Sequence, residues 1–180
     1  MAKQYPSISP VLQEFIEAQK IFFVGTAAAD GRVNISPKGM DSLRVLSPNK
    51  VAWLSVTGSG NETAAHIQEL SRLTLMFCAF EGRPMILRLY GQAQVVYPRH
   101  ARWNELKAKF SDLPGTRQIF ELDIDLVQTS CGMSIPFFDY AGERDDLNTW
   151  AINKGEKLPD YWAEKNQISI DGKATHIFGD

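Results

Sequence analysis

The chain has 180 residues with 19 basic and 21 acidic side chains, and this length favours a single domain over residues 1–180. Hydrophobic residues make up 44% and charged residues 22% of it, a composition typical of a folded globular protein rather than a disordered or fibrous one. A formal charge of −2 excludes binding of nucleic acid through bulk positive charge. The longest apolar runs, such as Leu73–Phe80, are far shorter than the ~20 residues that span a bilayer, so no membrane segment is expected.

The N-terminal residues and the cysteines indicate a cytoplasmic protein. Met1–Pro10 lack the charged start followed by an apolar run that a secretory signal needs. Cys78 and Cys131 are too far apart for a local metal knuckle, and a reducing compartment would keep both as thiols. The three histidines are scattered without a metal-ligand spacing, so no metal site is expected.

The first quarter of the chain predicts a helix followed by a hairpin. An apolar stripe predicts a helix over Pro10–Gln19, with Ser9 as its N-cap and proline at its first position. Two segments rich in β-formers follow, Ile21–Thr26 and Arg32–Ser36. Because Asp30-Gly31 between them is a strong tight-turn signal, these two strands are expected to pair antiparallel.

Short strands and turns dominate the middle of the chain. Further strands are predicted over Leu43–Leu46, Val51–Val56, Leu73–Phe80, Met85–Val96 and Gln118–Thr129. Gly91 is expected to mark a bulge, and helices are predicted over Asn61–Leu70 and Pro98–Phe110. Since a helix interrupts the strands only occasionally, the predicted fold is mainly β with helices (α+β): an antiparallel barrel of about seven strands and three to four helices.

Residues 131–180 differ from the rest of the chain in composition. Pro, Gly and Asp are mixed there with many aromatic side chains, so the segment is too apolar to be disordered. Only Asp146–Lys154 suggests a further helix. We expect this C-terminal extension to wrap the barrel or a second subunit, with Phe138 and Trp150 as packing residues.

A glycine-rich stretch, Thr57-Gly-Ser-Gly-Asn-Glu-Thr63, leaves a predicted strand and enters a predicted helix. Such a junction directs free backbone N–H groups and the positive end of the helix dipole at one spot, where a phosphate binds readily. The alternative is a capping box, because Ser59 and Glu62 have its spacing.

Two basic residues could meet an anion. Lys38 follows the second strand and would supply a cation if the barrel brings it to the glycine-rich turn; otherwise it is a solvated surface lysine. Arg88 is a charge within an apolar strand, which means either an outward-facing side chain or a partner for a buried anion.

Several segments in this order resemble the flavin-binding split-barrel proteins related to pyridoxamine 5'-phosphate oxidase. The resemblance covers roughly residues 10–135. The segments that carry it are Phe22-Phe-Val-Gly-Thr26, Asp30-Gly31, Val33-Asn-Ile-Ser-Pro-Lys-Gly39, Val51-Ala-Trp-Leu54, Thr57-Gly-Ser-Gly-Asn-Glu-Thr63, Leu87-Arg-Leu-Tyr-Gly91 and Thr129-Ser-Cys-Gly132.

The resemblance implies a six- or seven-stranded antiparallel split barrel, a homodimer, and FMN bound in the cleft between the two subunits. It places a basic residue of the second strand and the polar residues of the glycine-rich turn against the FMN phosphate: Lys38, Thr57, Ser59, Asn61 and Thr63. By the same likeness, other residues would lie beside the isoalloxazine ring: Asn34, Ser36 and Pro37 on the second strand, and Arg88 on the barrel wall.

The chain departs from the family at two places. The serine and lysine common in the family's turn are Asn61 and Thr63 here, which reduces the positive charge at the phosphate. The W-x-G-x-R-L segment that holds the B6 vitamin in true pyridoxamine-phosphate oxidases is absent, and the chain has Asn166-Gln-Ile-Ser-Ile-Asp-Gly172 near its end. A vitamin B6 substrate is therefore not expected.

Three hypotheses follow. The first is a cytoplasmic, homodimeric, FMN-dependent oxidoreductase that acts on an unidentified small molecule, with a nicotinamide as a candidate electron donor. The second is a binding protein that holds flavin or haem for storage or sensing without turnover. The third is an interaction module in which the glycine-rich turn only caps a helix.

Overall fold

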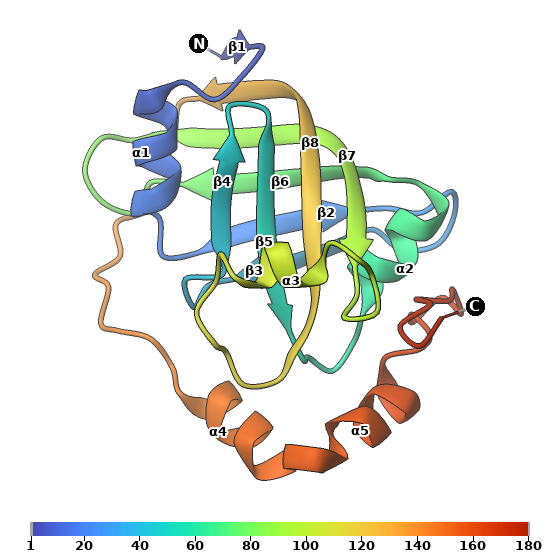
Figure 1. Cartoon of the computed structure of the whole chain (residues 1–180). Helices are drawn as coiled ribbons and strands as arrows, with labels where there is room; N and C mark the ends of the chain where they lie inside the picture. Colours follow the sequence, from blue (N-terminus) through green and yellow to red (C-terminus); the bar gives the residue numbers. More distant parts are fainter. Residues whose placement is uncertain (1, 180) are drawn as a thin grey trace.

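The computed structural model describes residues 2–179, which form one antiparallel sheet curled into an open barrel (Figure 1). Its strands are β1 (Lys3–Tyr5), β2 (Phe22–Thr26), β3 (Asn34–Lys38), β4 (Leu43–Ser47), β5 (Lys50–Val56), β6 (Arg72–Cys78), β7 (Ile86–Val96) and β8 (Thr116–Ser130). In space they follow the order β3-β2-β6-β7-β8-β5-β4, and the short β1 adds to β8. The predicted antiparallel barrel is confirmed, and β1 is the strand that the sequence did not predict.

Helices lie outside this sheet. They are α1 (Pro10–Ala18), α2 (Glu62–Glu69), α3 (Trp103–Lys107), α4 (Asp146–Lys154), α5 (Leu158–Lys165) and the 3₁₀ turn η1 (Gly155–Lys157). The predicted helix Asp146–Lys154 is confirmed, whereas α5 was not predicted. No helix among residues 2–179 has the length and apolar character needed to cross a bilayer.

Helix α1 begins as its sequence predicts. The Ser9 Oγ accepts a hydrogen bond from the Leu12 N–H at 3.4 Å, and proline occupies the first helical position. Leu12 and Ile16 point from the helix into the core and are buried. The apolar stripe read from the sequence is therefore the packed face of the helix.

The core lies inside the barrel and is built from the inward side chains of the strands. Trp53 on β5 stacks on Phe120 of β8 with ring centroids 4.7 Å apart, and its edge meets Phe22 of β2 at 6.5 Å. A second, smaller cluster lies beneath α3, around Leu54, Leu106 and Ile119. This double core fixes the strands that position the site described below.

Two predicted segments differ from the structure. The hairpin between β2 and β3 pairs antiparallel as predicted, but β3 begins at Asn34 instead of Arg32, so the loop spans residues 27–33. The loop is drawn out because Asp30 and Arg32 form ion pairs with the C-terminal segment, at Lys173 and Asp171. The helix predicted over Pro98–Phe110 is reduced to α3, since tighter i to i−3 hydrogen bonds replace helical ones on both sides of it.

The bulge predicted at Gly91 is present. The β7–β8 register steps from Tyr90↔Leu126 to Gly91↔Ile124, so Asp125 has no partner opposite it. A Cβ on Gly91 would lie 1.9 Å from the Asp123 carbonyl oxygen. Glycine is required here for close approach of two backbones.

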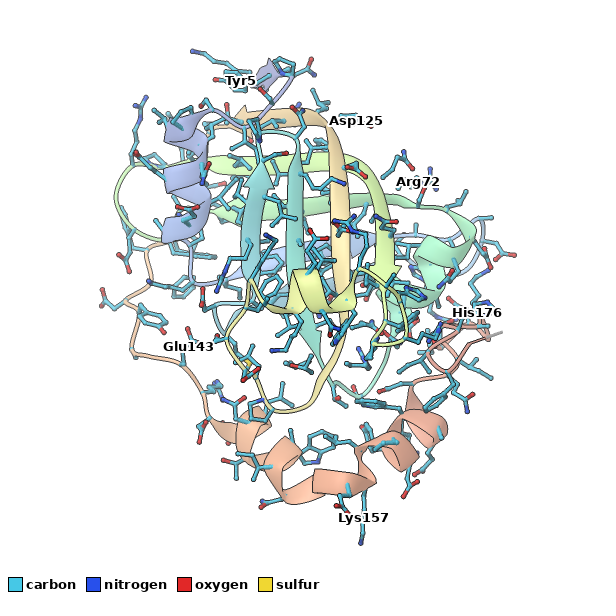
Figure 2. All side chains as sticks on the ribbon, in the orientation of Figure 1. Tyr5, Arg72, Asp125, Glu143, Lys157 and His176 are labelled. Carbon is cyan, nitrogen blue, oxygen red and sulfur yellow. The ribbon has the colours of Figure 1, made fainter. Side chains whose placement is uncertain are left out.

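The C-terminal extension lies against its own barrel. After β8 the chain runs down one side, α4 and α5 lie below the barrel, and the last residues return beside α2 (Figure 1). Phe138 packs edge-on against Phe80 at 5.4 Å, whereas Trp150 packs against Tyr161 of α5 at 5.0 Å. Figure 2 shows the side chains of this extension and of the barrel. The segment therefore contacts its own barrel, and its contact with a second subunit stays a prediction.

Candidate anion and flavin site

The glycine-rich turn connects β5 to α2, and the helix that it starts has no side-chain cap. Asn61 is the N-cap residue, but its side chain makes no capping hydrogen bond. The Glu62 carboxylate accepts from the Ile170 N–H at 3.1 Å, and Ser59 is exposed. The capping-box interpretation of Ser59 and Glu62 is therefore wrong, because the Glu62 carboxylate bonds to the backbone of Ile170 in the C-terminal extension.

The two polar sides of the turn are used differently. The carbonyl of Gly58 accepts from Asn166 Nδ2 at 3.2 Å, and that of Gly60 accepts from Arg117 Nη1 at 3.1 Å. Within residues 2–179, by contrast, the N–H groups of Ser59, Gly60 and Asn61 have no acceptor. Free N–H groups at the start of a helix are the usual donors to a bound phosphate.

Strand β3 presents alternate residues to opposite sides. Asn34, Ser36 and Lys38 are half-buried, whereas Ile35 and Pro37 between them are exposed. The Ser36 Oγ is buried without a hydrogen-bond partner. Asn34, Ser36 and Lys38 therefore face inward, and the central hydroxyl, that of Ser36, is free to bond to a ligand. Pro37 lies on the outer face.

The Lys38 ammonium has no ion pair or hydrogen bond among the described residues. Burial, followed by repulsion from the Arg117 guanidinium, lowers the pKa of Lys38 from 10.5 to about 8. Holding a half-buried ammonium without a counterion costs stability, so the position calls for an anion.

Arg117 at the start of β8 is a second cation without a counterion. It is 4% exposed, and its Nη1 donates to neutral oxygens only, Gly60 O at 3.1 Å and Asn166 Oδ1 at 2.7 Å. Its Nε is buried without a partner, and burial lowers its pKa to about 10. Lys38 and Arg117 thus repel each other, and Arg117 contacts the uncapped turn through the Gly60 carbonyl.

Most other polar side chains of the predicted site bond to protein groups. The Thr57 hydroxyl donates to Gly115 O and accepts from Trp162 Nε1, both at 2.8 Å. Asn61 exchanges hydrogen bonds with Gln118, the shorter being Gln118 Nε2 to Asn61 Oδ1 at 2.6 Å. The turn is thereby rigid, and its side chains shape the site more than they offer donors to it.

Asn34 and Thr63 are brought together at the other end of β3. Asn34 Nδ2 donates to the hydroxyl oxygens of Thr63, at 3.2 Å, and Thr26, at 3.3 Å. The Thr26 hydroxyl also lies 3.1 Å from Nδ1 of His66, which is buried in α2. This cluster fastens the N-terminal end of β3 to the first turn of α2.

Arg88 is not part of this group. It lies on the outer face of β7 between two fully buried leucines, and its Nη1 donates to Ser130 Oγ at 3.2 Å. The register places it in the row Pro37–Phe23–Met76–Arg88, three strands from Pro37. Arg88 therefore lies on the outer face of the sheet, and its predicted position beside the isoalloxazine ring stays a prediction.

A groove with a volume of about 1390 Å³ runs between α1, the β6–β7 turn and residues 129–143. Apolar and aromatic side chains contribute much of its wall, among them Phe15, Phe80 and Phe138. Lys20 and Glu143, which also line it, lie next to Gly39, the residue after Lys38. The groove therefore reaches the end of β3 where the unpaired lysine is located.

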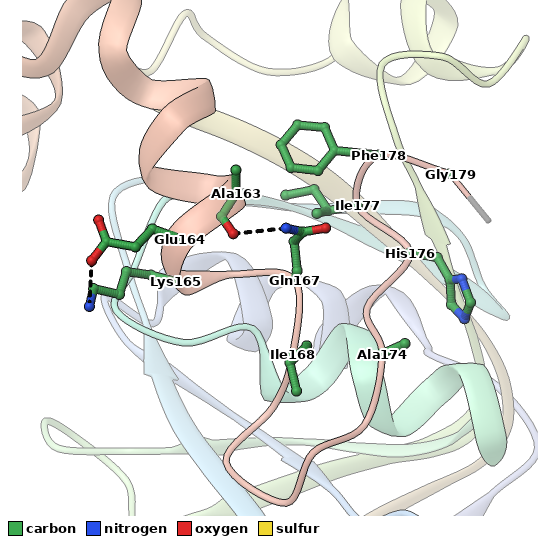
Figure 3. A pocket seen from close by; sticks show the side chains of 10 residues that line it. All are labelled: Ala163, Glu164, Lys165, Gln167, Ile168, Ala174, His176, Ile177, Phe178 and Gly179. Atoms are coloured by element: carbon green, nitrogen blue, oxygen red, sulfur yellow. Dashed lines mark hydrogen bonds and ion pairs between the residues drawn. The ribbon is translucent and has the colours of Figure 1, made fainter.

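A smaller hollow of about 370 Å³ lies between α5 and the last described residues (Figure 3). Its wall includes the Glu164–Lys165 ion pair, with Nζ to Oε1 at 2.8 Å, and Gln167, whose Nε2 donates to Ala163 O at 2.8 Å. Both pairs are exposed and local to this surface. The hollow carries no unpartnered charge comparable to Lys38 or Arg117.

Comparison with known proteins decides the family. The sequence profile described as pyridoxamine 5'-phosphate oxidase matches residues 8–131. A pyridoxamine 5'-phosphate oxidase family protein of Aspergillus flavus is 39% identical over 189 aligned positions, which cover 93% of this chain and 75% of the relative. The chain belongs to the pyridoxamine 5'-phosphate oxidase family. The resemblance found in the sequence is confirmed.

Solved structures agree with this family fold at low sequence identity. A candidate pyridoxamine 5'-phosphate oxidase of Lactobacillus delbrueckii has a TM-score of 0.54 at 20% identity, over 68% of this chain and 94% of that one. HupZ of group A Streptococcus has a TM-score of 0.53 at 18% identity, over 66% and 91%. The FAD-binding protein of Mycobacterium smegmatis has a TM-score of 0.50 at 12% identity, over 70% and 97%. These likenesses establish the split-barrel fold.

The pyridoxamine 5'-phosphate oxidase family is a flavin-binding one, and the residues present here fit a flavin phosphate. The unused N–H groups of the turn, the buried Ser36 hydroxyl and the uncompensated cations are the donors that such an anion needs. Sequence reasoning identified Lys38 but missed Arg117 and Asn166. The position of Arg117 beside a β-strand start was a weak signal, and Asn166 gave none because its partners are 49 and 108 residues away.

Proposed function

We propose that this protein is an FMN-binding flavoprotein that acts as an oxidoreductase on a small molecule. The observation that carries the proposal is the pairing of an uncapped helix start with two cations, Lys38 and Arg117, that have no carboxylate partner among residues 2–179. A phosphate monoester carries close to two negative charges at pH 7, which matches two cations. Membership of a flavin-binding family supports FMN as the molecule that brings this phosphate.

The bound flavin would supply hydride transfer, and the protein would bind, orient and shield it. In this proposal the turn and Lys38 hold the phosphate, and the β3 row Asn34–Ser36 runs along the cofactor. The groove beside Gly39 has room for a planar substrate and walls of aromatic side chains. We propose a nicotinamide as the electron donor; bound flavin that no nicotinamide reduces would instead favour a storage or sensing role.

We also propose that the protein works as a cytoplasmic homodimer with flavin at the subunit interface. The outer face of β3 and β2 supports this proposal, because Ile35 is 71% exposed and Phe23, opposite Pro37, is only half-buried. An exposed apolar patch on a sheet edge is a surface that a second copy would cover. Light scattering is expected to give twice the 20.2 kDa chain mass. A monomer at micromolar concentration would contradict the shared site.

FMN binding is expected to depend on pH through Lys38. Since the pKa of Lys38 in the free protein is about 8 and the phosphate binds its charged form, affinity should be nearly level between about pH 7, where the phosphate is mostly dianionic, and pH 8. Above pH 8 it should fall by up to about tenfold per pH unit, because binding must then take up a proton. Titration of the purified protein with FMN, followed by flavin fluorescence at pH 7, 8 and 9, measures this.

Riboflavin, which lacks the phosphate, is the matched control in that titration. Its affinity should be lower at pH 7 and should change little between pH 7 and 9. Absence of a flavin absorption band together with no FMN binding at any pH would overturn the proposed function. FMN binding with a flat pH profile would retain the flavoprotein and remove Lys38 from the phosphate site.

A further inference from the structure

The C-terminal extension closes over the carbonyl side of the glycine-rich turn through one buried residue. Asn166, which follows α5, has no exposed surface. Its Nδ2 donates to Gly58 O at 3.2 Å and its Oδ1 accepts from Arg117 Nη1 at 2.7 Å. Since Arg117 in turn donates to Gly60 O, the Asn166–Arg117 pair holds two carbonyls of the turn.

Asn166 is itself fixed on every side. Its main-chain oxygen accepts from Thr175 Oγ1 at 2.7 Å and from Asn61 Nδ2 at 3.4 Å, and its N–H donates to Trp162 O at 2.9 Å. Trp162 also reaches the turn directly through its bond to Thr57. Every polar group of Asn166 has a hydrogen-bond partner, so its amide is held in one orientation.

Holding the carbonyls also sets the direction of the amides. In a planar trans peptide the C=O and the following N–H point in opposite directions. With the Gly58 and Gly60 carbonyls turned toward Asn166 and Arg117, the N–H groups of Ser59 and Asn61 point away from them. These are two of the N–H groups that have no acceptor within residues 2–179.

The side chain at position 166 is neutral, and this matters for Arg117. A carboxylate there would form an ion pair with the guanidinium and cancel its charge. An amide accepts the same hydrogen bond and leaves the positive charge available beneath the turn. The neutral partner thus orients the arginine without competing with an anion.

We propose that Asn166 is a positioning residue for phosphate recognition: through Arg117 and Gly58 it holds the glycine-rich turn with its N–H groups directed at the ligand and keeps the arginine charge uncompensated. This inference rests on the proposed FMN function. It assigns to the C-terminal extension, which lies outside the matched family region 8–131, a direct part in the cofactor site.

The first test replaces the amide by Asn166→Ala in the full chain. We expect the FMN dissociation constant to rise about tenfold or more, while riboflavin affinity stays within about twofold, since only the phosphate contact is loosened. The matched control is Gln167→Ala, the exposed neighbouring amide whose bond to Ala163 is local to the hollow in Figure 3. It should leave both affinities unchanged.

A second variant, Asn166→Asp, separates positioning from general stability. The new carboxylate would pair with Arg117, so the melting temperature should exceed that of Asn166→Ala, yet FMN affinity should fall further than in the alanine variant. A purely structural role predicts the reverse, with binding recovering together with stability. If Asn166→Ala does not fold, Thr175→Val removes the hydroxyl that holds Asn166 and should raise the FMN dissociation constant severalfold.

The rise in melting temperature caused by inorganic phosphate separates the proposed role of Asn166 from the proposed flavin function. Wild type that binds FMN and phosphate, with variants that bind both equally well, would overturn the role of Asn166 and leave the flavin function intact. Wild type that gains stability from phosphate but does not bind FMN would remove the flavin, and loss of that gain in Asn166→Ala would still support the positioning role. Parallel loss of FMN and riboflavin affinity would also overturn it.

Discussion

Replacing Lys38 by methionine is expected to make the protein more stable at pH 7 by roughly 3 kcal/mol and at the same time to weaken FMN binding by tenfold or more. The difference between the ordinary lysine pKa of 10.5 and the folded-state pKa of about 8 corresponds to this energy. Methionine keeps the volume of the aliphatic stem, and no hydrogen bond of Lys38 is lost. Opposite signs for stability and binding are typical of a site built for a ligand.

The pH dependence of the stability gained by Lys38→Met identifies the buried charge as its source. Below pH 8, Lys38 is charged in both the folded and unfolded states, so wild type carries the full penalty. Between pH 8 and 10.5 the unfolded chain binds the proton that the folded protein has lost, and wild-type stability rises with pH. The advantage of Lys38→Met in the free energy of unfolding should therefore be constant up to pH 8 and vanish near pH 10.5.

Urea unfolding of the two proteins at pH 7, 9 and 10.5, without flavin, measures this difference. Lys109→Met, at an exposed lysine, is the matched control and should change neither stability nor FMN affinity appreciably. A destabilised Lys38→Met protein would mean that the ammonium has a partner and that the anion site lies elsewhere. Taking the difference from wild type cancels the alkaline titration of Tyr97, whose pKa is raised by burial in both proteins.

The barrel could be predicted because its signals are local. Helix α1 has its cap, its proline and its apolar stripe within ten residues. Prediction from local signals failed where a segment is shaped by contacts with residues far away in the sequence. The 27–33 loop depends on Asp171 and Lys173, some 140 residues away, and no pattern near Asp30 encodes that contact.

The residues of the candidate site likewise divide into those with local sequence signals and those without. Lys38 and the glycine-rich turn were found because strand ends and helix starts are recognisable in the sequence. Arg117 and Asn166 were missed because their importance lies in what surrounds them: the lack of a carboxylate near a buried guanidinium, and an amide that closes on two carbonyls. Burial and missing counterions are properties of the folded chain alone.

The second large effect is expected on stability, from a substitution at the Gly91 bulge. We expect Gly91→Ala to lower the free energy of unfolding by roughly 3 kcal/mol or more. Its Cβ would lie 1.9 Å from Asp123 O and 2.8 Å from Asp123 C, and both are backbone atoms of the neighbouring strand. A side chain could rotate out of the way, but here β7 and β8 must separate and lose ladder hydrogen bonds around the Gly91↔Ile124 pair.

Gly25→Ala is the matched control, because it adds the same methyl group to another strand glycine. Its Cβ would come no closer than 3.8 Å to Thr74 O, an ordinary contact, so stability should stay level or rise slightly as the unfolded chain loses freedom. Urea unfolding at one fixed protein concentration compares the two variants with wild type. Equal losses would show that a methyl group on either strand glycine is costly, whereas a large loss confined to Gly91→Ala ties it to the close approach of β7 and β8. That approach sets the register of the two longest strands of the barrel, including the strand that begins at the Arg117 end of the site.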